Sequence, residues 1–443
     1  MITTLPTRRR LDRADAAAAT VGLGLFAVAA VVGAVLGYVG HPVRASAAPL
    51  FAHWLPHVGP GTPLAVIVAA LVVRYGPRLA AELSWRRLRA ITYVAALSWI
   101  LALALVDGVQ RGLTGRLSTP TEYLREVGGI GSVNALLRTF TSRILDFQPD
   151  SWTTHVAGHP PGAVLVFVGL DRIGLGGAGW AVLACVLVGA AAAIAVPETV
   201  RLLGDEEAAR VAVPFAVLFP GAVWIGASAD GLFTGVTACG VALATHGLVR
   251  RNQGSSVAGG VLLGYGVYLS YGLVLLAPVV VAAAIVVRRV RPLAWCVCGA
   301  LAVAAAFTAS GFWWPEGYHL VVQRYNQGIA SERAYLYWVW ANLAAVTASI
   351  GPAALAVIRR SVAPAGRAPS HPAGWALPLA AAVAVLAADV SGLSKAEVER
   401  IWLPFAVWFA AGAALLPEAD RRHWLIAQAV TALAVNHLLL TAW

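Results

Sequence analysis

Long apolar segments recur along the whole chain and are separated by short polar segments. Residues 16–39 can cross a bilayer outright, because about 20 apolar residues span its hydrocarbon core. Several other segments are shorter, which is typical of tilted or re-entrant helices. Together they predict about 13 transmembrane helices, roughly 11–13. The expected spans are residues 16–39, 58–73, 90–106, 178–196, 211–228, 231–249, 256–270, 272–287, 293–311, 336–358, 375–390, 401–416 and 424–442.

This pattern predicts an all-α polytopic membrane protein, and the composition supports the same fold class. Of the 443 residues, 59% are hydrophobic and only 12% are charged. A soluble domain carries about 25% charged residues. A mean hydropathy of +0.75 therefore excludes a soluble globular enzyme, a disordered chain and a fibrous repeat.

Arginine clusters between the spans predict the orientation, because short cytoplasmic loops are enriched in Lys and Arg. Threading the spans from a cytoplasmic N-terminus places every such cluster inside. The clusters are Arg8–Arg13, Arg74–Arg89, Arg250–Arg251, Arg288–Arg291, Arg359–Arg360 and Arg421–Arg422. The net charge of +11 thus reflects orientation in a bilayer, here the plasma membrane, and no nucleic-acid partner is expected.

The same threading places residues 107–177, 229–230, 312–335 and 391–400 on the outer face. We expect membrane helices in residues 1–85, a core in 86–416 and a C-terminal membrane helix in 417–443.

Within the large first outer loop, residues 133–145 have helical apolar spacing, which predicts an amphipathic surface helix. Residues 161–173 are apolar, but a crossing there would invert every later loop. We therefore expect a juxtamembrane or re-entrant helix.

Acidic side chains in the first outer loop are the main candidates for chemistry. Asp107 stands at a span exit and Glu122 follows in the loop. Either carboxylate could act as a general base beside a lipid-facing cavity, or could be a solvated loop acid. Asp230 lies in a tight outer turn. It is either the N-cap of the next span or a polar group that faces a cavity.

Two histidines in this loop are four residues apart, but they do not predict a metal site. Pro160 lies between His155 and His159 and breaks a helix that both would have to share. The run from His159 to Gly162 instead predicts a helix N-terminus at the membrane interface.

The late outer segments carry cations beside aromatic side chains. Arginine at a membrane boundary suits a lipid-linked phosphate, because guanidinium binds phosphate bidentately. The alternative is interfacial anchoring by Trp, Tyr and Arg. The candidate phosphate-binding residues are Arg324, Arg333, Lys395 and Arg400, and the polar neighbours are Tyr325, Gln327, Glu397 and Glu399.

Four features together resemble the GT-C superfamily of integral membrane glycosyltransferases. The large first outer loop has an acid at the span exit and a Glu122-Tyr123-Leu124 run. His159-Pro160-Pro161-Gly162 resembles the stretch that opens a short helix in protein mannosyltransferase-like members. Residues 219–242 resemble a span pair with a polar turn, and 396–403 resemble a late motif of bacterial lipid-linked sugar transferases.

The resemblance implies transfer of a sugar, mannose or arabinose, from a polyprenyl-phosphate donor with inversion. The acceptor would be an envelope glycan, a glycolipid or a protein. Asp107 or Glu122 would be the base, and Arg400, with Arg324, Arg333 or Lys395, would stabilise the phosphate. The substrate-binding residues would be Tyr123, His155, His159, Asp230, Tyr325, Gln327, Glu397 and Glu399. No metal or other cofactor is expected.

Two departures from the family pattern leave the base unassigned between the two acids. Two spans precede the one that ends at Asp107, and the loop has no paired-acid motif. The competing functional class is a transporter or flippase of lipid-linked sugars, which would carry polar groups at mid-span. A non-catalytic scaffold would tolerate loss of the candidate acids and Arg400 together.

Overall fold

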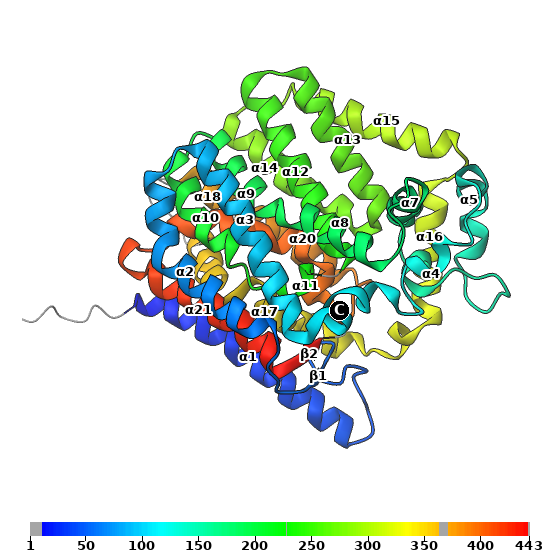
Figure 1. The fold of residues 1–443 in the computed structure, drawn as a ribbon, viewed down its shortest axis with the longest axis horizontal. Helices are drawn as coiled ribbons and strands as arrows, with labels where there is room; N and C mark the ends of the chain where they lie inside the picture. Colours follow the sequence, from blue (N-terminus) through cyan, green and yellow to red (C-terminus); the bar gives the residue numbers. More distant parts are fainter. Residues whose placement is uncertain (1–10, 227, 363–370, 442–443) are drawn as a thin grey trace, which may run out of the picture.

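Helices form nearly all of the regular structure (Figure 1). The computed structural model describes residues 11–226, 228–362 and 371–441; Arg8–Arg10 of the first basic cluster lie outside these ranges. Within them, seven helices are long and apolar enough to cross a membrane, or eight if one bent pair counts as a single span. The all-α polytopic class is thereby confirmed, while the expected number of about 13 spans stays a prediction.

Every expected span coincides with one or more helices. The helices of the first half are α1 Arg13–Tyr38, α2 Gly61–Glu82, α3 Trp85–Ala104, α4 Leu124–Val127, α5 Val133–Thr139, α6 Thr154–Ala157, α7 Pro161–Arg172, α8 Ala178–Ala190, α9 Ala192–Leu202, α10 Glu206–Val217 and α11 Ala222–Ile225. Those of the second half are α12 Ala229–Arg250, α13 Gln253–Leu269, α14 Ala277–Val287, α15 Leu293–Ala309, α16 Trp314–Gln327, α17 Tyr335–Val362, α18 Pro372–Val390, α19 Val398–Ile401, α20 Leu403–Ala406 and α21 Glu418–Leu438.

Several expected spans are shorter or broken. The segment 211–228 comprises α10 and α11, which are separated around Pro220, and 401–416 comprises short helical pieces. The α15–α16 pair bends by 77°. Gly311 lies in this bend with φ +103°, a conformation that glycine adopts without steric cost. Hydropathy alone does not distinguish such broken segments from continuous spans.

Two helices were predicted in the loop 107–177, and the structure agrees with the prediction for one of them and differs for the other. Helix α7 begins at Pro161, as predicted, because proline at the first helical position lacks only an N–H that would be unbonded anyway. The expected helix over 133–145 ends earlier, at Thr139. The indole of Trp152 donates to the carbonyl oxygen of Phe140 at 3.0 Å, and the Trp152 amide donates to Arg143. These bonds take up carbonyls that a longer helix would use.

Segments that were predicted to share a membrane side do contact one another. Near the start of α1, the buried Asp15 pairs with Arg359 at 2.6 Å and Arg360 at 2.7 Å. Beyond the other end of α1, Arg44 pairs with Glu332. Because α1 has 26 residues, about 39 Å separates these two sets of contacts. Arg359 and Arg360 therefore lie at the opposite end of α1 from the Arg44–Glu332 pair. We call the end at Arg44, which also carries Asp107, Glu122, Asp230 and Glu397, the acid-rich end.

A short antiparallel pair joins distant parts of the sequence at the acid-rich end. Strand β1, Ala52–Trp54, pairs with β2, Leu439–Thr441, directly after α21. The hydroxyl of Thr62 also lies 2.9 Å from His437 Nε2. The loop before α2 is thus fixed to the end of α21 (Figure 1).

Helix α17 has a sharp break at Gly351, where φ is +75°. The following Pro352 cannot donate a backbone hydrogen bond. Gln428 of α21 compensates, because its amide nitrogen donates to Ile350 O at 2.8 Å and its amide oxygen accepts from Ala353 N at 3.3 Å. A Cβ at position 351 would collide with this amide and with Pro220.

We expect Gly351→Ala to lower the free energy of unfolding by at least about 2 kcal/mol, because the collision and the strained φ act together. Thermal unfolding in detergent, followed by tryptophan fluorescence, measures the change. Gly24→Ala in α1 is the matched control, since no atom lies within 4 Å of its added Cβ. Equal melting temperatures for the two variants would contradict the role of the break.

Candidate functional site

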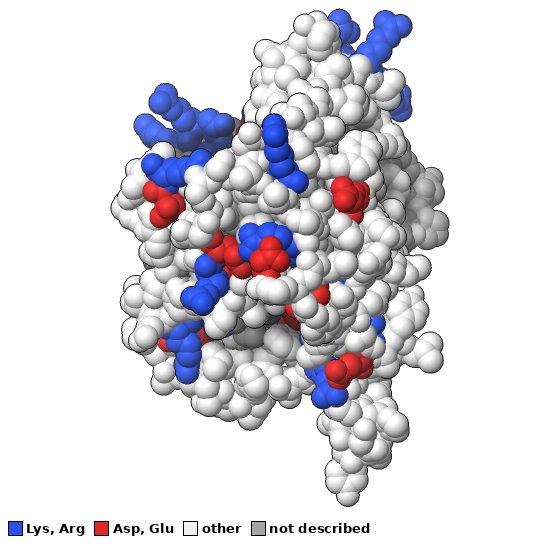
Figure 2. Space-filling view, turned by 90° about the vertical axis from the view of Figure 1, so that its right-hand side faces the viewer, with Lys and Arg blue, Asp and Glu red and all other residues white. Residues whose placement is uncertain are grey.

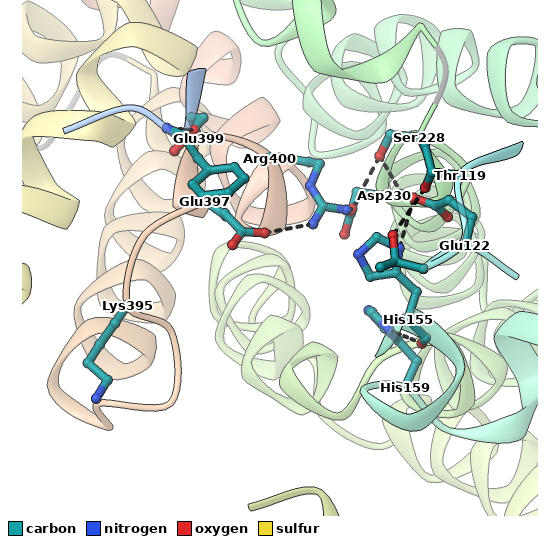
Figure 3. Close-up of polar contacts among 12 residues, drawn as sticks. Thr119, Glu122, His155, His159, Ser228, Asp230, Lys395, Glu397, Glu399 and Arg400 are labelled. Atoms are coloured by element: carbon teal, nitrogen blue, oxygen red, sulfur yellow. Dashed lines mark hydrogen bonds and ion pairs between the residues drawn. The ribbon is translucent and has the colours of Figure 1, made fainter. Parts of the chain in front are cut away.

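A buried arginine lies at the centre of the acid-rich end. Arg400 follows the loop after α18 and is 6% exposed. Its Nη1 lies 2.5 Å from Asp230 Oδ2, and its Nη2 lies 3.3 Å from Glu397 Oε2. Burial disfavours the charged guanidinium, but the nearby carboxylates, Asp230 foremost, outweigh burial and raise its pKa. Arg400 is therefore a fixed cation between two acids (Figure 3).

Asp230 is positioned by the start of α12. The N-cap of this helix is Ser228, whose hydroxyl accepts from Asp230 N at 3.0 Å and donates to Asp230 Oδ2 at 3.2 Å. The N-cap alternative for Asp230 is therefore wrong, and its carboxylate faces Arg400 instead. The first turn of a helix stabilises a negative charge through the helix dipole. Sequence reasoning missed Ser228, although a serine before a helical run is a usual N-cap.

Glu122 joins this group from the first outer loop. It is 4% exposed, and its Oε1 lies 2.8 Å from His155 Nδ1. The backbone supports the pair, because His155 N donates to Thr121 O at 3.0 Å. Figure 3 shows Glu122 and His155 on the side of Asp230 that faces away from Glu397. The loop and α12 thus place two carboxylates close to one arginine.

Tyr123 is packed beside these carboxylates. Its ring stacks on Phe167 of α7 with centroids 5.3 Å apart. Burial raises the pKa of its hydroxyl well above the ordinary value, and the charges of Asp230 and Glu122 add to the effect. The hydroxyl has no hydrogen-bond partner among the described residues. A neutral, buried donor is therefore available next to the acids.

His159 is a neutral imidazole at the N-terminus of α7. Burial, above all, lowers its pKa to about 4. Its Nδ1 lies 2.8 Å from His155 O, a carbonyl that can only accept, so Nδ1 carries the proton. Its ring lies 5.6 Å from that of Phe233 in α12. His159 thus connects the outer loop to the first turns of α7 and α12.

The late outer segments supply a second buried cation. Arg333 is 4% exposed and lies 3.1 Å from Glu397 Oε1. It also donates to Lys395 O at 2.6 Å. Lys395 N donates to the hydroxyl of Tyr325 at 2.9 Å, and its ammonium lies 5.7 Å from the Tyr325 ring centre. Glu397 therefore links Arg333 and Arg400. The Lys395 side chain projects away from Glu397 and Arg400 (Figure 3).

Other predicted residues belong to different contacts. Arg324 pairs with Asp146 at 2.7 Å, and Gln327 Oε1 accepts from Asp146 N at 2.8 Å. These contacts fix α16 to the first outer loop. Acidic and basic side chains intermingle on this face of the protein (Figure 2). Arg324 and Gln327 thus brace the outer loop in this structure.

Asp107 lies in a polar cluster of its own. Its carboxylate is 2.8 Å from His57 Nε2, 2.9 Å from Arg116 and 3.3 Å from Arg111. Arg116 is itself buried and donates to Thr441 O, in β2. The sequence suggested neither His57 nor Arg116, because their contact with Asp107 depends on how the loops pack. This cluster fastens the start of the outer loop to the β1–β2 pair.

Glu399 points toward the loop before β1. Its Oε1 accepts from Phe51 N at 3.0 Å, and its Oε2 has no partner among the described residues. Burial, as the largest cause, raises the pKa of this carboxyl to about 7. Within the described ranges, no group of three or more His, Cys, Asp or Glu side chains is arranged to hold a metal ion.

No protein-family model matches the chain, and no curated protein sequence matches it. Among solved structures, ArnT from Cupriavidus metallidurans overlaps with 73% of this chain in its apo state, at a TM-score of 0.43 and 18% identity. The same protein bound to undecaprenyl phosphate overlaps with 74%, at 0.43 and 17%. An oligosaccharyltransferase from Archaeoglobus fulgidus, tethered to an acceptor peptide, overlaps with 78%, at 0.38 and 13%.

The chain spans 59% and 60% of the two ArnT chains and 54% of the oligosaccharyltransferase chain. Overlaps at such low identity do not assign an activity to this chain. Its function is therefore argued from its own residues.

Glu399 makes stability depend on pH. The carboxyl has a pKa of about 7 when folded and an ordinary value of 4.5, so the folded protein retains the proton as the pH rises between them. The free energy of unfolding then falls by up to about 1.4 kcal/mol per pH unit. Glu399→Gln removes this slope, so its melting temperature should exceed that of the wild type increasingly from pH 5 to 8. A constant difference over this range would contradict the assignment.

Proposed function

We propose that this chain is a GT-C-type membrane glycosyltransferase that uses a polyprenyl-phosphate sugar donor on the outer face of the plasma membrane. The observation that carries the proposal is the buried Arg400 held between Asp230 and Glu397, with Glu122 on the far side of Asp230. A buried charge is costly to desolvate, and a charge kept inside a membrane protein commonly serves binding or catalysis. A buried arginine beside several carboxylates suits recognition of a phosphate together with activation of a hydroxyl.

The proposed reaction is a single displacement. A carboxylate takes the proton from the acceptor hydroxyl, and the acceptor oxygen attacks the anomeric carbon of the donor sugar. The bond from this carbon to the phosphate oxygen breaks, with inversion, and both bonding electrons leave with the lipid phosphate. The leaving group is already anionic, so it needs no general acid. Arg400 and Arg333 would stabilise its negative charge.

We assign the base to Glu122 rather than to Asp107. Asp107 is held by two arginines and lies beside His57, so both of its carboxylate oxygens already have partners. Glu122 pairs with His155 and lies close to Arg400, where a donor phosphate would bind. Asp230 is bound to Arg400 at 2.5 Å, which suits a role in orienting the guanidinium.

The remaining polar residues would bind the sugar and the acceptor. Tyr123 offers a neutral hydroxyl, and His155 and His159 adjoin it, with ring centroids 6.1 Å and 5.8 Å from the tyrosine ring. Lys395 and Tyr325 are half-buried, and a lipid phosphate would approach past them. Mannose and arabinose are the proposed sugars, and an envelope glycan, a glycolipid or a protein is the proposed acceptor.

Sugar transfer by the purified protein tests the proposal directly. With polyprenyl-phosphate mannose or arabinose and a cell-envelope acceptor, the wild type should transfer sugar. Glu122→Gln should lower turnover by about 10²–10⁴-fold, as expected for loss of a general base. Asp150→Asn is the matched control, because this acid lies in the same loop and is 67% exposed. If the wild type instead moves the lipid-linked sugar across liposomes without transfer, it is a flippase.

The Asp107→Asn variant tests whether Asp107 has a structural or a catalytic role. Removing its charge leaves the buried Arg116 without its carboxylate, which costs about 3–5 kcal/mol for a buried pair. We therefore expect a lower melting temperature, with turnover within about threefold of the wild type below that temperature. A variant that keeps its melting temperature but loses turnover would make Asp107 the base.

A further inference from the structure

Glu397 spans the two buried arginines with its two carboxylate oxygens. Oε1 lies 3.1 Å from both Nη1 and Nη2 of Arg333, and Oε2 lies 3.3 Å from Nη2 of Arg400. The arginines come from different parts of the chain, Arg333 from the segment before α17 and Arg400 from α19. A carboxylate therefore already lies between the two cations; Figure 3 shows its contact with Arg400.

The Glu397 carboxylate makes the longest ion-pair contacts of the group. Its distances of 3.1–3.3 Å exceed the roughly 2.7–2.9 Å of strong charge-assisted bonds. The Arg400–Asp230 contact, in comparison, is 2.5 Å. The Glu397 side chain is 17% exposed, against 4% for Arg333 and 7% for Arg400. A ligand that enters from outside would meet Glu397 before it meets the arginines.

The backbone around Glu397 is strained. Ala396 and Glu397 have φ values of +68° and +64°, in the left-handed region that non-glycine residues rarely adopt. The buried Asn342 of α17 holds this turn, because its Oδ1 accepts from Ala396 N at 3.1 Å and its Nδ2 donates to Ser394 O at 2.7 Å. Such a turn is stable only while its contacts persist.

We propose that the Glu397 carboxylate occupies the phosphate position in the empty protein and that a lipid-linked phosphate displaces it from Arg333 and Arg400. This inference rests on the proposed function. Polyprenyl phosphate, the lipid product, has a terminal phosphate with about −1.5 to −2 charge and three acceptor oxygens, so it competes well against a single carboxylate. The donor phosphodiester, with one negative charge, competes less strongly. No covalent bond changes in this exchange.

The same exchange of Glu397 and phosphate would also operate after sugar transfer, when the product leaves. The donor is a phosphodiester with one negative charge, whereas the released polyprenyl phosphate is a monoester with more charge. Two buried arginines would hold this product more tightly than the donor. Glu397, returning to its position between them, favours release of the product.

Binding of undecaprenyl phosphate in detergent tests the proposal. We expect Glu397→Gln to bind it roughly tenfold more tightly than the wild type, because the competing charge is gone. Glu332→Gln is the matched control: it removes an acid that precedes Arg333 directly but pairs with Arg44 and is 54% exposed. Its dissociation constant should change less than about twofold.

Two further probes distinguish the ligand chemistry. If the phosphate alone is recognised, inorganic phosphate should also bind Glu397→Gln more tightly than the wild type and Glu332→Gln, with weaker affinity throughout. Neutral undecaprenol should bind all three proteins equally. An equal gain in Glu332→Gln would mean general electrostatics and would overturn the proposal. Weaker binding in Glu397→Gln would do the same, since Glu397 would then position the arginines.

A measurement on the wild type avoids reliance on a variant that could fold poorly. A water-soluble carbodiimide should modify Glu397 faster when undecaprenyl phosphate is bound, as mass spectrometry of the peptide can show. Unchanged or slower modification would overturn the exchange. Failure of the wild type to bind undecaprenyl phosphate at all would overturn the proposed function as well, whereas binding without these effects would overturn only the exchange.

Discussion

The burial of the Arg400 guanidinium is the constraint on which the acid-rich end depends. A charge removed from water is stable only beside opposite charges and hydrogen-bond acceptors. Here those partners come from the start of α12 and from the turn before α19, with the first outer loop close by. Helix ends that are far apart in sequence must therefore meet at one point. The packing of the whole helical body is what allows them to meet.

Ordinary features of helix ends bring these side chains together. Ser228 caps α12 and turns the Asp230 carboxylate toward the arginine. Pro161 starts α7, whose Phe167 supports Tyr123 beside the carboxylates. Asn342, in the first third of the apolar α17, fixes the turn that carries Glu397. Each element is locally unremarkable, and the site arises from their shared location.

The sequence predicted the helical class and the grouping of loops for physical reasons that are visible in the chain. Apolar length indicates a span and arginine placement indicates a side, so Glu122, Asp230 and Arg400 were expected on one face. The partners of Asp107 were not, because the contacts of His57 and Arg116 depend on side-chain directions in packed loops. Hydropathy also cannot tell a short helix such as α14 or a broken segment from a complete span. Arg324 and Gln327 have suitable chemistry, yet the bend before α16 brings them to Asp146 instead.

The β1–β2 pair has a consequence for biosynthesis. The strand before α2 is made well before its partner, which follows α21. Until β2 has been made, β1 has no partner strand, and Arg116 lacks the Thr441 carbonyl that accepts its hydrogen bond. The β1–β2 pair therefore forms only after all the intervening helices have been made. During that interval the nascent chain exposes an unpaired strand edge, which is open to pairing with other strands.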